Sequence, residues 1–252
     1  MEVEGAAEFG EEFAEIYDLL PSSMYNGDAS ECVEMLAELS RSSSILELGV
    51  GTGRIALPLS ARCPNVTVVD SSQKMLDSLR SKVGSDRLRI VGGDLASVKL
   101  GERFGLIYIL CNTIFCLLTQ DEQLKCFRNA RKMLTDDGLF VVETFVGTPQ
   151  PTERSWSLDR HVSISDDSVI LSASRANAND QILEQRTIYI TNRGIKLLTS
   201  RLRFALPAEL DLMGRLAGLE MVERWSGWKR QPFLSESNWQ IAVYRPQNDR
   251  AS

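Results

Sequence analysis

Residues 45–54 read ILELGVGTGR, and this short stretch decides the fold of the chain. A strand-like segment is followed at once by glycines at positions 49, 51 and 53. Strand and glycine-rich turn together are typical of α/β proteins in which a nucleotide-containing cofactor approaches the backbone. The dinucleotide fingerprint G-x-G-x-x-G needs its third glycine one residue later, where Arg54 stands, so the spacing disfavours a nicotinamide cofactor.

The charge beside this turn narrows the kind of cofactor further. Glu47 lies two residues before the first glycine, near the end of the expected strand. A carboxylate there is unfavourable beside a pyrophosphate but favourable beside an ammonium or sulfonium group. The sequence therefore indicates a cationic cofactor.

Short apolar runs alternate with amphipathic segments over the first part of the chain, which predicts a parallel sheet with helices on both faces. We expect two leading helices at 11–20 and 28–41, then strands at 45–49, 66–70, 88–92, 104–110 and 138–145, with helices at 53–62, 72–82 and 121–134.

After Thr144 the rhythm changes to consecutive strands separated by turn clusters, at 160–164, 168–175, 182–191 and 195–204, before a helix that starts near Pro207 and strands at 219–225 and 238–245. The predicted fold class is α/β, a Rossmann-like doubly wound seven-stranded sheet with an inserted antiparallel β cap. We expect N-terminal helices and the cofactor-binding core over 1–150, the cap or substrate insertion over 151–204, and the rest of the core over 205–252.

Composition excludes several classes of partner. The 252 residues are 43% hydrophobic and 25% charged, typical of a globular chain with one sizeable core. Lys and Arg number 28 against 34 Asp and Glu, a net charge of −6 without a dense basic run, so nucleic acid is not an expected partner. Five scattered cysteines and a single histidine predict reduced thiols and no metal site. The acidic start and the lack of a long apolar run predict a cytoplasmic protein without membrane contact.

Over most of its length, the chain resembles the class I S-adenosylmethionine-dependent methyltransferases. LELGVGTG is similar to the first motif of that family, and VTVVDSSQKML, VGGDLA, FGLIYILCNTIF and RKMLTDDGLFVVETF resemble its later segments in the same order. The likeness is to members that act on small molecules, such as natural-product tailoring enzymes and amino-sugar N-methyltransferases. It implies S-adenosylmethionine as cofactor and S-adenosylhomocysteine as its product.

The same resemblance implies which residues meet each part of the cofactor. The methionine portion would lie along Gly49, Gly51 and Gly53, with Glu47 near its amino group. Asp70 would bind the ribose hydroxyls. Adenine would meet Asp94 and Leu95, with Met75 on the ring face, while Asn112 closes over the cofactor and Tyr17 lies across the mouth of the site.

Two residues are candidates for a general base, although positioning can supply much of the acceleration in methyl transfer. Glu143 stands near the end of the fifth expected strand, where carboxyl ends of parallel strands face the ligand crevice, but it could also be a capping or surface carboxylate. His161, the single histidine, has a suitable intrinsic pKa but could equally face solvent at the start of a hairpin.

The expected reaction is methyl transfer to a nitrogen or oxygen of a small-molecule substrate, a secondary metabolite or a sugar-derived amine. CNTIFC, after the fourth strand, lacks the prolines of enzymes that methylate base amines, which disfavours a nucleic-acid acceptor. The alternating pattern of QILEQRTIYIT gives the cap a polar face that could meet substrate or a second copy of the chain in a homodimer. Two alternatives stay open: a catalytically silent cofactor-binding scaffold, and a nicotinamide-dependent reductase.

Overall fold

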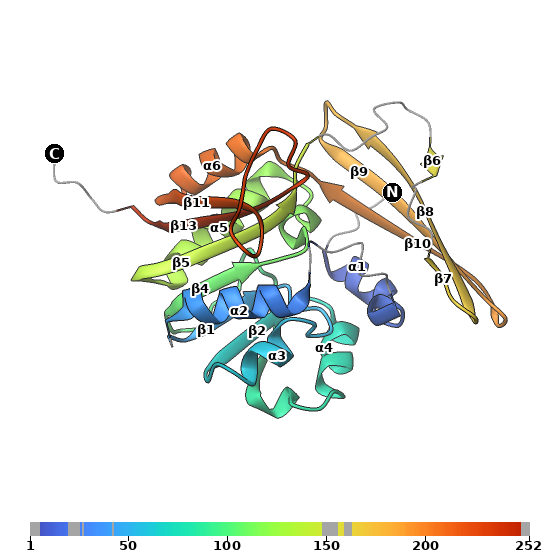
Figure 1. Ribbon diagram of the computed structural model, residues 1–252, viewed down its shortest axis with the longest axis horizontal. Helices are drawn as coiled ribbons and strands as arrows, with labels where there is room; N and C mark the ends of the chain where they lie inside the picture. Colours follow the sequence, from blue (N-terminus) through green and yellow to red (C-terminus); the bar gives the residue numbers. More distant parts are fainter. Residues whose placement is uncertain are drawn as a thin grey trace.

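The computed structural model describes residues 6–19, 26, 28–41, 43–147, 156–158 and 163–247. They form a large central sheet flanked by helices and a second, antiparallel sheet that stands to one side of it (Figure 1). Strand order in the central sheet is β12-β11-β13-β5-β4-β1-β2-β3. The predicted α/β class is confirmed; the eighth strand is the two-residue β12 (Gln231–Pro232), which pairs with β11 at one edge.

The parallel part of the central sheet holds β1 (Ile45–Leu48), β2 (Val66–Asp70), β3 (Leu88–Gly92), β4 (Phe104–Ile109) and β5 (Leu134–Phe145). The chain runs outward from β1 to β3 and then returns to place β4 on the other side of β1, with Ile45 opposite both Val66 and Leu106. This reversal creates a switch point between β1 and β4, the place where open α/β sheets bind ligands. Beyond β5, the strands β13 (Trp239–Pro246) and β11 (Leu219–Gly227) run antiparallel to their neighbours.

Apolar side chains cover both faces of this sheet. Along β1, Leu46 and Leu48 belong to one buried cluster and Ile45 to another, as the alternation of side chains in a strand requires. The first cluster takes in residues of α5 (Gln120–Met133) and α6 (Pro207–Leu216), and the second takes in residues of α2 (Ala29–Ser40) and α3 (Ala56–Ser60). The helices therefore form the two outer layers of the core.

Local sequence signals account for where the helices begin. The Asp28 carboxylate accepts a hydrogen bond from the Ser30 backbone N–H at the start of α2, and Thr119 with Glu122 forms a capping box at the start of α5. Ser72 caps α4 (Gln73–Arg80) by accepting from the Met75 backbone N–H across 3.2 Å. The segment from Asp70 to Met75, which joins β2 to α4, is thereby held in a fixed turn.

Some boundaries differ from the sequence-based expectations. In place of one helix over 11–20, the structure has α1 (Ala6–Phe13) and the 3₁₀ turn η1 (Tyr17–Leu19). The expected helix at 53–62 is shortened to α3 because the turn bond from the Gly53 N–H to the Val50 carbonyl extends the glycine loop. Two further short 3₁₀ elements lie in the described residues, η3 (Ser85–Arg87) and η4 (Thr113–Cys116).

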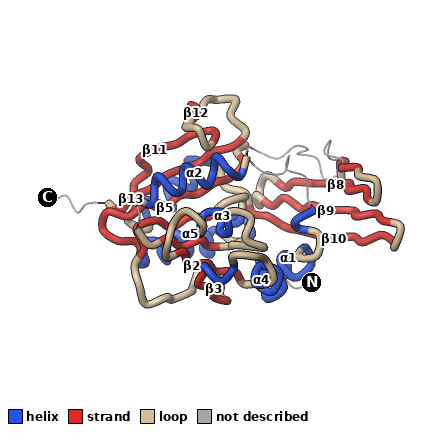
Figure 2. The backbone as a smooth tube through the Cα atoms, turned by 60° about the horizontal axis from the view of Figure 1, so that its bottom comes forward, coloured by secondary structure: helices blue, strands red, loops and turns tan. Residues whose placement is uncertain are grey.

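The second sheet is the expected antiparallel cap. Its long strands are β8 (Ser168–Asn177), β9 (Ile182–Thr191) and β10 (Gly194–Arg203), with the short β6 (Ser157–Leu158) and β7 (Ser163–Ile164) beside β8. Helix α1 contacts both α4 of the core and β10 of the cap, an arrangement visible in Figures 1 and 2. The exact limits of the three predicted parts stay predictions.

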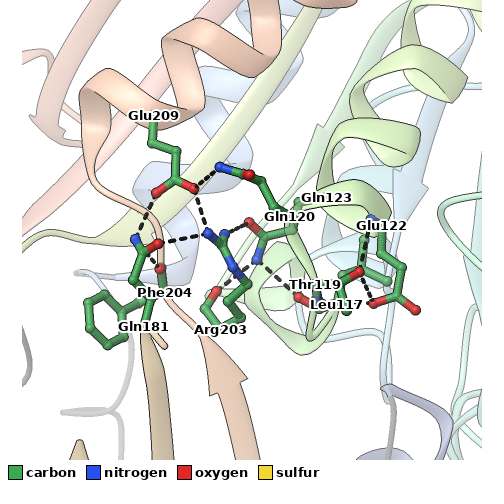
Figure 3. A network of polar contacts seen from close by, with 9 residues as sticks. All are labelled: Leu117, Thr119, Gln120, Glu122, Gln123, Gln181, Arg203, Phe204 and Glu209. Carbon is green, nitrogen blue, oxygen red and sulfur yellow. Dashed lines mark hydrogen bonds and ion pairs between the residues drawn. The ribbon is translucent and has the colours of Figure 1, made fainter. Parts of the chain in front are cut away.

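A buried polar network joins the base of the cap to the core (Figure 3). At the end of β10, the Arg203 guanidinium donates to Glu209 of α6 at 2.6 Å, to Gln123 of α5 at 2.8 Å and to Gln181 at 2.8 Å. The Gln123 amide returns a 2.7 Å bond to the Arg203 carbonyl. These bonds hold the last residues of β10 against two helices of the core.

In the described residues, no helix has the length and apolarity needed to cross a membrane.

Candidate functional site

A cavity lies where the glycine loop of the core, the N-terminal helices and the inner face of the cap meet. It encloses about 1010 Å³ of empty space, its open mouth included. The lining residues are Gly10, Phe13, Tyr17, Gly49, Gly51, Asp70, Ser71, Met75, Leu95, Cys111, Asn112, Thr113, Cys116, Gln185, Thr187, Ser200 and Leu202. The cavity therefore occupies the switch point of the sheet, with the cap as its roof.

The glycines of the opening motif have separate tasks. Gly49 and Gly51 line the cavity at φ values of 82° and 57°, in the left-handed region that favours glycine. A Cβ atom on Gly49 would lie 2.2 Å from Cγ2 of Thr113, whereas one on Gly51 would point toward the ring of Tyr17 at 3.7 Å. Gly53 does not line the cavity: a Cβ there would lie 2.3 Å from Cδ1 of Leu79, so its lack of a side chain serves packing.

Asp70, at the end of β2, fixes the shape of the loop from the neighbouring strand. Its Oδ2 accepts from the Gly51 N–H at 2.7 Å and its Oδ1 from the Ser72 N–H at 2.9 Å. Burial raises the pKa of the Asp70 carboxyl, and the backbone donors act in the opposite direction. A hydrogen-bond acceptor therefore faces the cavity at the edge of the glycine loop.

Apolar and amide groups complete the core side of the cavity. Met75 and Leu95 are 2% and 4% exposed and both line it, as the expected adenine contacts should. Asn112 lies in the loop after β4, and its Oδ1 accepts from the Phe145 N–H at 2.7 Å. The structure thus brings these three predicted residues together with Asp70, Gly49 and Gly51.

Tyr17 lies in η1 and lines the cavity beside Gly51, where the sequence places it. The next residue holds this turn in place: Asp18 accepts from the Thr52 hydroxyl at 2.5 Å and pairs with Lys82 at 2.6 Å. The turn that carries Tyr17 is therefore anchored to the glycine loop by a bond between residues 34 positions apart, Asp18 and Thr52.

Glu47 and Asp94 lie outside the cavity lining. Glu47 is buried in the core side of β1, where its Oε2 accepts from the Tyr108 hydroxyl at 2.9 Å, and burial raises its pKa to about 8. Asp94 is exposed and caps its own turn, since its Oδ1 accepts from the Ala96 N–H at 2.9 Å and its Oδ2 from the Ser97 hydroxyl at 2.8 Å. Neither geometry supports direct contact with a cavity ligand.

Glu143 also lies outside the cavity lining, although it is near the carboxyl end of β5 as expected. It is 2% exposed, its Oε2 accepts from the Cys111 N–H at 2.9 Å and its Oε1 from the Trp228 indole at 2.8 Å. This geometry does not support a general base, because the carboxylate faces structural donors. His161, the other candidate base, lies outside the described residues.

Sequence reasoning missed most of the cap side and the wall beside η4. Gln185 and Thr187 of β9, together with Ser200 and Leu202 of β10, close the cavity from the cap. The alternating polar positions of β9 were the available signal, but alternation alone does not tell which ligand the polar row meets. Cys111 and Cys116 add two thiols whose pKa is raised by burial, that of Cys116 to about 12, so both stay protonated.

Comparison with known proteins agrees with this architecture. Residues 45–138 match the family model described as a methyltransferase domain. The CcbJ methyltransferase of Streptomyces caelestis is 36% identical, with 97% of this chain and 100% of that chain covered and a TM-score of 0.89. The cypemycin N-terminal methyltransferase of a Streptomyces species is 26% identical over 245 residues, 95% of this chain and 98% of that protein. The sugar N-methyltransferase KedS8 of a Streptoalloteichus species, at 18% identity, shares the fold with a TM-score of 0.68 over 97% of this chain and 99% of that one.

The chain belongs to the class I S-adenosylmethionine-dependent methyltransferases. The cavity fits this cofactor in its chemistry: the glycine loop exposes backbone, Asp70 offers a carboxylate, and Met75 and Leu95 offer an apolar slot. The enzyme is therefore dependent on S-adenosylmethionine, as the resemblance to this family implied.

Proposed function

We propose that this enzyme transfers the methyl group of S-adenosylmethionine to a nitrogen or oxygen of a small-molecule acceptor, a secondary metabolite or a sugar-derived amine. One observation carries the proposal: the cavity has two unlike walls. The core wall, with Gly49, Gly51 and Asp70, has the groups that suit the cofactor. The cap wall presents the amide and hydroxyl groups of Gln185, Thr187 and Ser200, which suit an acceptor rich in hydroxyls and amines.

The lining favours nitrogen over oxygen as the accepting atom. Among its described residues, Asp70 is the only carboxylate, and none is a histidine or lysine. Asp70 already accepts two backbone N–H groups. An alcohol needs a base to become nucleophilic near neutral pH, whereas a free amine does not. The names of two relatives, the cypemycin N-terminal methyltransferase and a sugar N-methyltransferase, support the same choice.

In this proposal the residues act by holding and orienting. Bound S-adenosylmethionine supplies an electrophilic methyl group on a sulfonium sulfur. Asp70 would accept from the ribose hydroxyls, Met75 and Leu95 would pack on the adenine, and Gly51 would leave room for the methionine portion. Tyr17 closes the mouth, so the acceptor meets the methyl group in a site from which water is excluded.

The first experiment is calorimetric titration of the purified protein with S-adenosylmethionine and S-adenosylhomocysteine, after removal of cofactor retained from expression. NADH and NADPH serve as controls. We expect micromolar binding of the two sulfur compounds alone, followed by methylation of a member of an amine panel. Tight cofactor binding with no turnover on any amine or alcohol would instead favour the silent scaffold.

A pair of aspartates tests the cofactor side of the site. Asp70→Ala should weaken S-adenosylmethionine binding by about 1 to 3 kcal/mol, because two hydrogen bonds to the ribose are lost. Asp94→Ala should leave the affinity nearly unchanged, because that carboxylate caps its own turn. Equal losses of cofactor affinity in the two variants would indicate that Asp94 also contacts the cofactor. That result would contradict the assignment of contacts from the residues that line the cavity.

The acceptor side is tested by Thr187→Val, which removes one hydroxyl from the cap wall at nearly constant shape. We expect an unchanged dissociation constant for the cofactor and a KM for the acceptor raised by about tenfold. A change in the cofactor affinity alone would indicate that Thr187 contacts the cofactor and not the acceptor.

The homodimer stays a prediction, for which sedimentation equilibrium is the direct measurement.

A further inference from the structure

The turn that follows β4 has an unfavourable backbone conformation at the wall of the cavity. Cys111 and Asn112 have φ values of 53° and 64°, although neither is a glycine. Left-handed conformations are disfavoured for most residues with a Cβ atom and least so for asparagine, so the strain is greatest at Cys111, and two such residues in succession need outside support. Both residues line the cavity, so whatever supports this turn also shapes the site.

Glu143 makes two of the hydrogen bonds that hold the turn. Its side-chain Oε2 accepts from the Cys111 N–H at 2.9 Å, and its backbone carbonyl accepts from the Asn112 N–H at 3.2 Å. Two residues further along β5, the Phe145 N–H donates to Oδ1 of Asn112 at 2.7 Å. The end of β5 therefore holds both residues of the turn by hydrogen bonds.

The Glu143 carboxylate is itself fixed from two other segments of the chain. Its Oε1 accepts from the Trp228 indole at 2.8 Å, and the Asn26 side chain also forms a hydrogen bond with it. The Glu143 side chain is buried, so water does not compete for these bonds. Cys111, Trp228 and Asn26 all present N–H donors, which a carboxylate with two acceptor oxygens satisfies and an amide cannot.

We propose that Glu143 is a positioning residue for methyl transfer: its carboxylate holds the Cys111–Asn112 turn in the left-handed conformation and thereby sets the cavity wall against which the cofactor binds. The effect on methyl transfer rests on the proposed function, whereas the hydrogen bonds between Glu143 and the turn do not depend on it. Proton abstraction from the acceptor is no part of this role, because Glu143 does not line the cavity.

The test compares Glu143→Gln with Trp228→Phe, which keeps the carboxylate and removes one donor that orients it. Amide hydrogen exchange of the ligand-free proteins and the dissociation constant of S-adenosylmethionine from pH 6 to 9 are measured. Glu143→Gln should speed exchange in the segment around Cys111 and raise the dissociation constant by about tenfold, because a hydrogen bond to a charged acceptor is lost. Its pH dependence should match that of the wild type. Trp228→Phe should change both quantities in the same direction by less, and the double variant should match Glu143→Gln.

Asp211→Asn is the matched control. Asp211 is a carboxylate that also has fixed hydrogen-bond partners: it accepts from the Tyr244 hydroxyl at 3.0 Å and pairs with Arg224. It lies on α6 and lines no part of the cavity. We expect lower thermal stability with unchanged cofactor affinity.

The outcomes separate this inference from the proposed function. Unchanged exchange and affinity in Glu143→Gln, or faster exchange spread over the whole sheet, would overturn the positioning role. So would a change in the pH dependence of binding confined to Glu143→Gln. If Glu143→Gln does not fold, Trp228→Phe decides by the same two readouts. A wild type that binds cofactor but methylates nothing would instead count against the proposed function, while the exchange data still report on the turn.

Discussion

The hydroxyl of Thr52 donates to the carboxylate of Asp18 across 2.5 Å, joining the glycine loop to the 3₁₀ turn that carries Tyr17. Lys82 strengthens this junction, because its Nζ pairs with Asp18 at 2.6 Å and donates to the Thr52 carbonyl at 2.8 Å. The N-terminal segment is thus bound to the motif that begins the core. Three groups from distant parts of the sequence meet at one point beside the cavity.

Asp18→Ala should therefore weaken S-adenosylmethionine binding by about three- to tenfold. Asp18 is half exposed and Lys82 is 29% exposed, which limits the energetic value of the pair to about 1 kcal/mol, but its loss removes the junction between η1 and the glycine loop. Titration calorimetry gives the dissociation constant. Asp77→Ala, which removes an exposed carboxylate paired with Arg80 within α4, is the control and should bind normally. Similar losses in both variants would mean that charge alone, not the junction, affects binding.

Gly51→Ala and Gly84→Ala separate backbone strain from obstruction of the cavity. Both glycines have positive φ, 57° and 88°, so each substitution should destabilise the fold by about 1 to 2 kcal/mol. A Cβ on Gly84 meets no atom within 4 Å, whereas one on Gly51 enters the space beside Tyr17. We expect comparable losses of thermal stability, with cofactor binding weakened at least about tenfold in Gly51→Ala alone. Normal binding by that variant would remove Gly51 from the contact surface.

The buried Glu47 makes the stability of the ligand-free enzyme depend on pH. Burial raises its pKa from 4.5 to about 8 in the folded state, so the folded protein holds a proton that the unfolded chain releases above pH 4.5. This contribution is complete below the unfolded pKa and is lost as the pH rises through about 8. Thermal melts between pH 5 and 9 should show wild-type stability falling relative to Glu47→Gln, which keeps the neutral form. Parallel pH profiles of the two proteins would contradict a raised pKa at Glu47.

Arg203 anchors the cap, and its loss should cost more than that of a neighbouring arginine. The Arg203 and Glu209 side chains are 8% and 16% exposed, so Arg203→Met leaves a nearly buried carboxylate without its cation. We expect the free energy of unfolding to fall by about 3 to 5 kcal/mol in denaturant titrations. Arg201→Met, on the same strand but paired with Glu184 at 3.5 Å in a more exposed position, should lose about 1 kcal/mol or less. Equal losses would show that the network in Figure 3 contributes no more than a surface pair.

Much of the architecture could be predicted because its signals are local. The run from Ile45 to Gly53 contains a fully buried strand and a turn with three positive-φ glycines, both of which depend on residues within a few positions of one another. The alternation of β9 likewise predicted a strand with one polar face. Asp70, which follows the second strand, could be placed near the glycine loop because parallel neighbours end at the same edge of a sheet.

The local sequence pattern could not predict which carboxylates contact a ligand and which have a structural role. Glu47, Asp94 and Glu143 all stand close to the ends of parallel strands, where a sequence reader expects ligand contact. Their surroundings differ because Tyr108, the Ala96 N–H and Trp228 engage them. Two of these partners are distant in the chain, and hydrogen-bond partners of that kind are defined only after the strands have packed.

The sequence determined the doubly wound sheet and the glycine loop, since periodicity and turn chemistry act over short stretches of chain. The order of its motifs indicated the class of cofactor, whereas the charge argument from Glu47 failed because that carboxyl faces Tyr108 and not the cavity. Tertiary structure alone decided that the polar row of β9 roofs the cavity and that Tyr17 is tied to Thr52 through Asp18. It also turned Glu143 toward Cys111 and Trp228. Those relationships join residues that lie 32 to 85 positions apart, and no local propensity specifies which distant side chains will share a buried hydrogen bond.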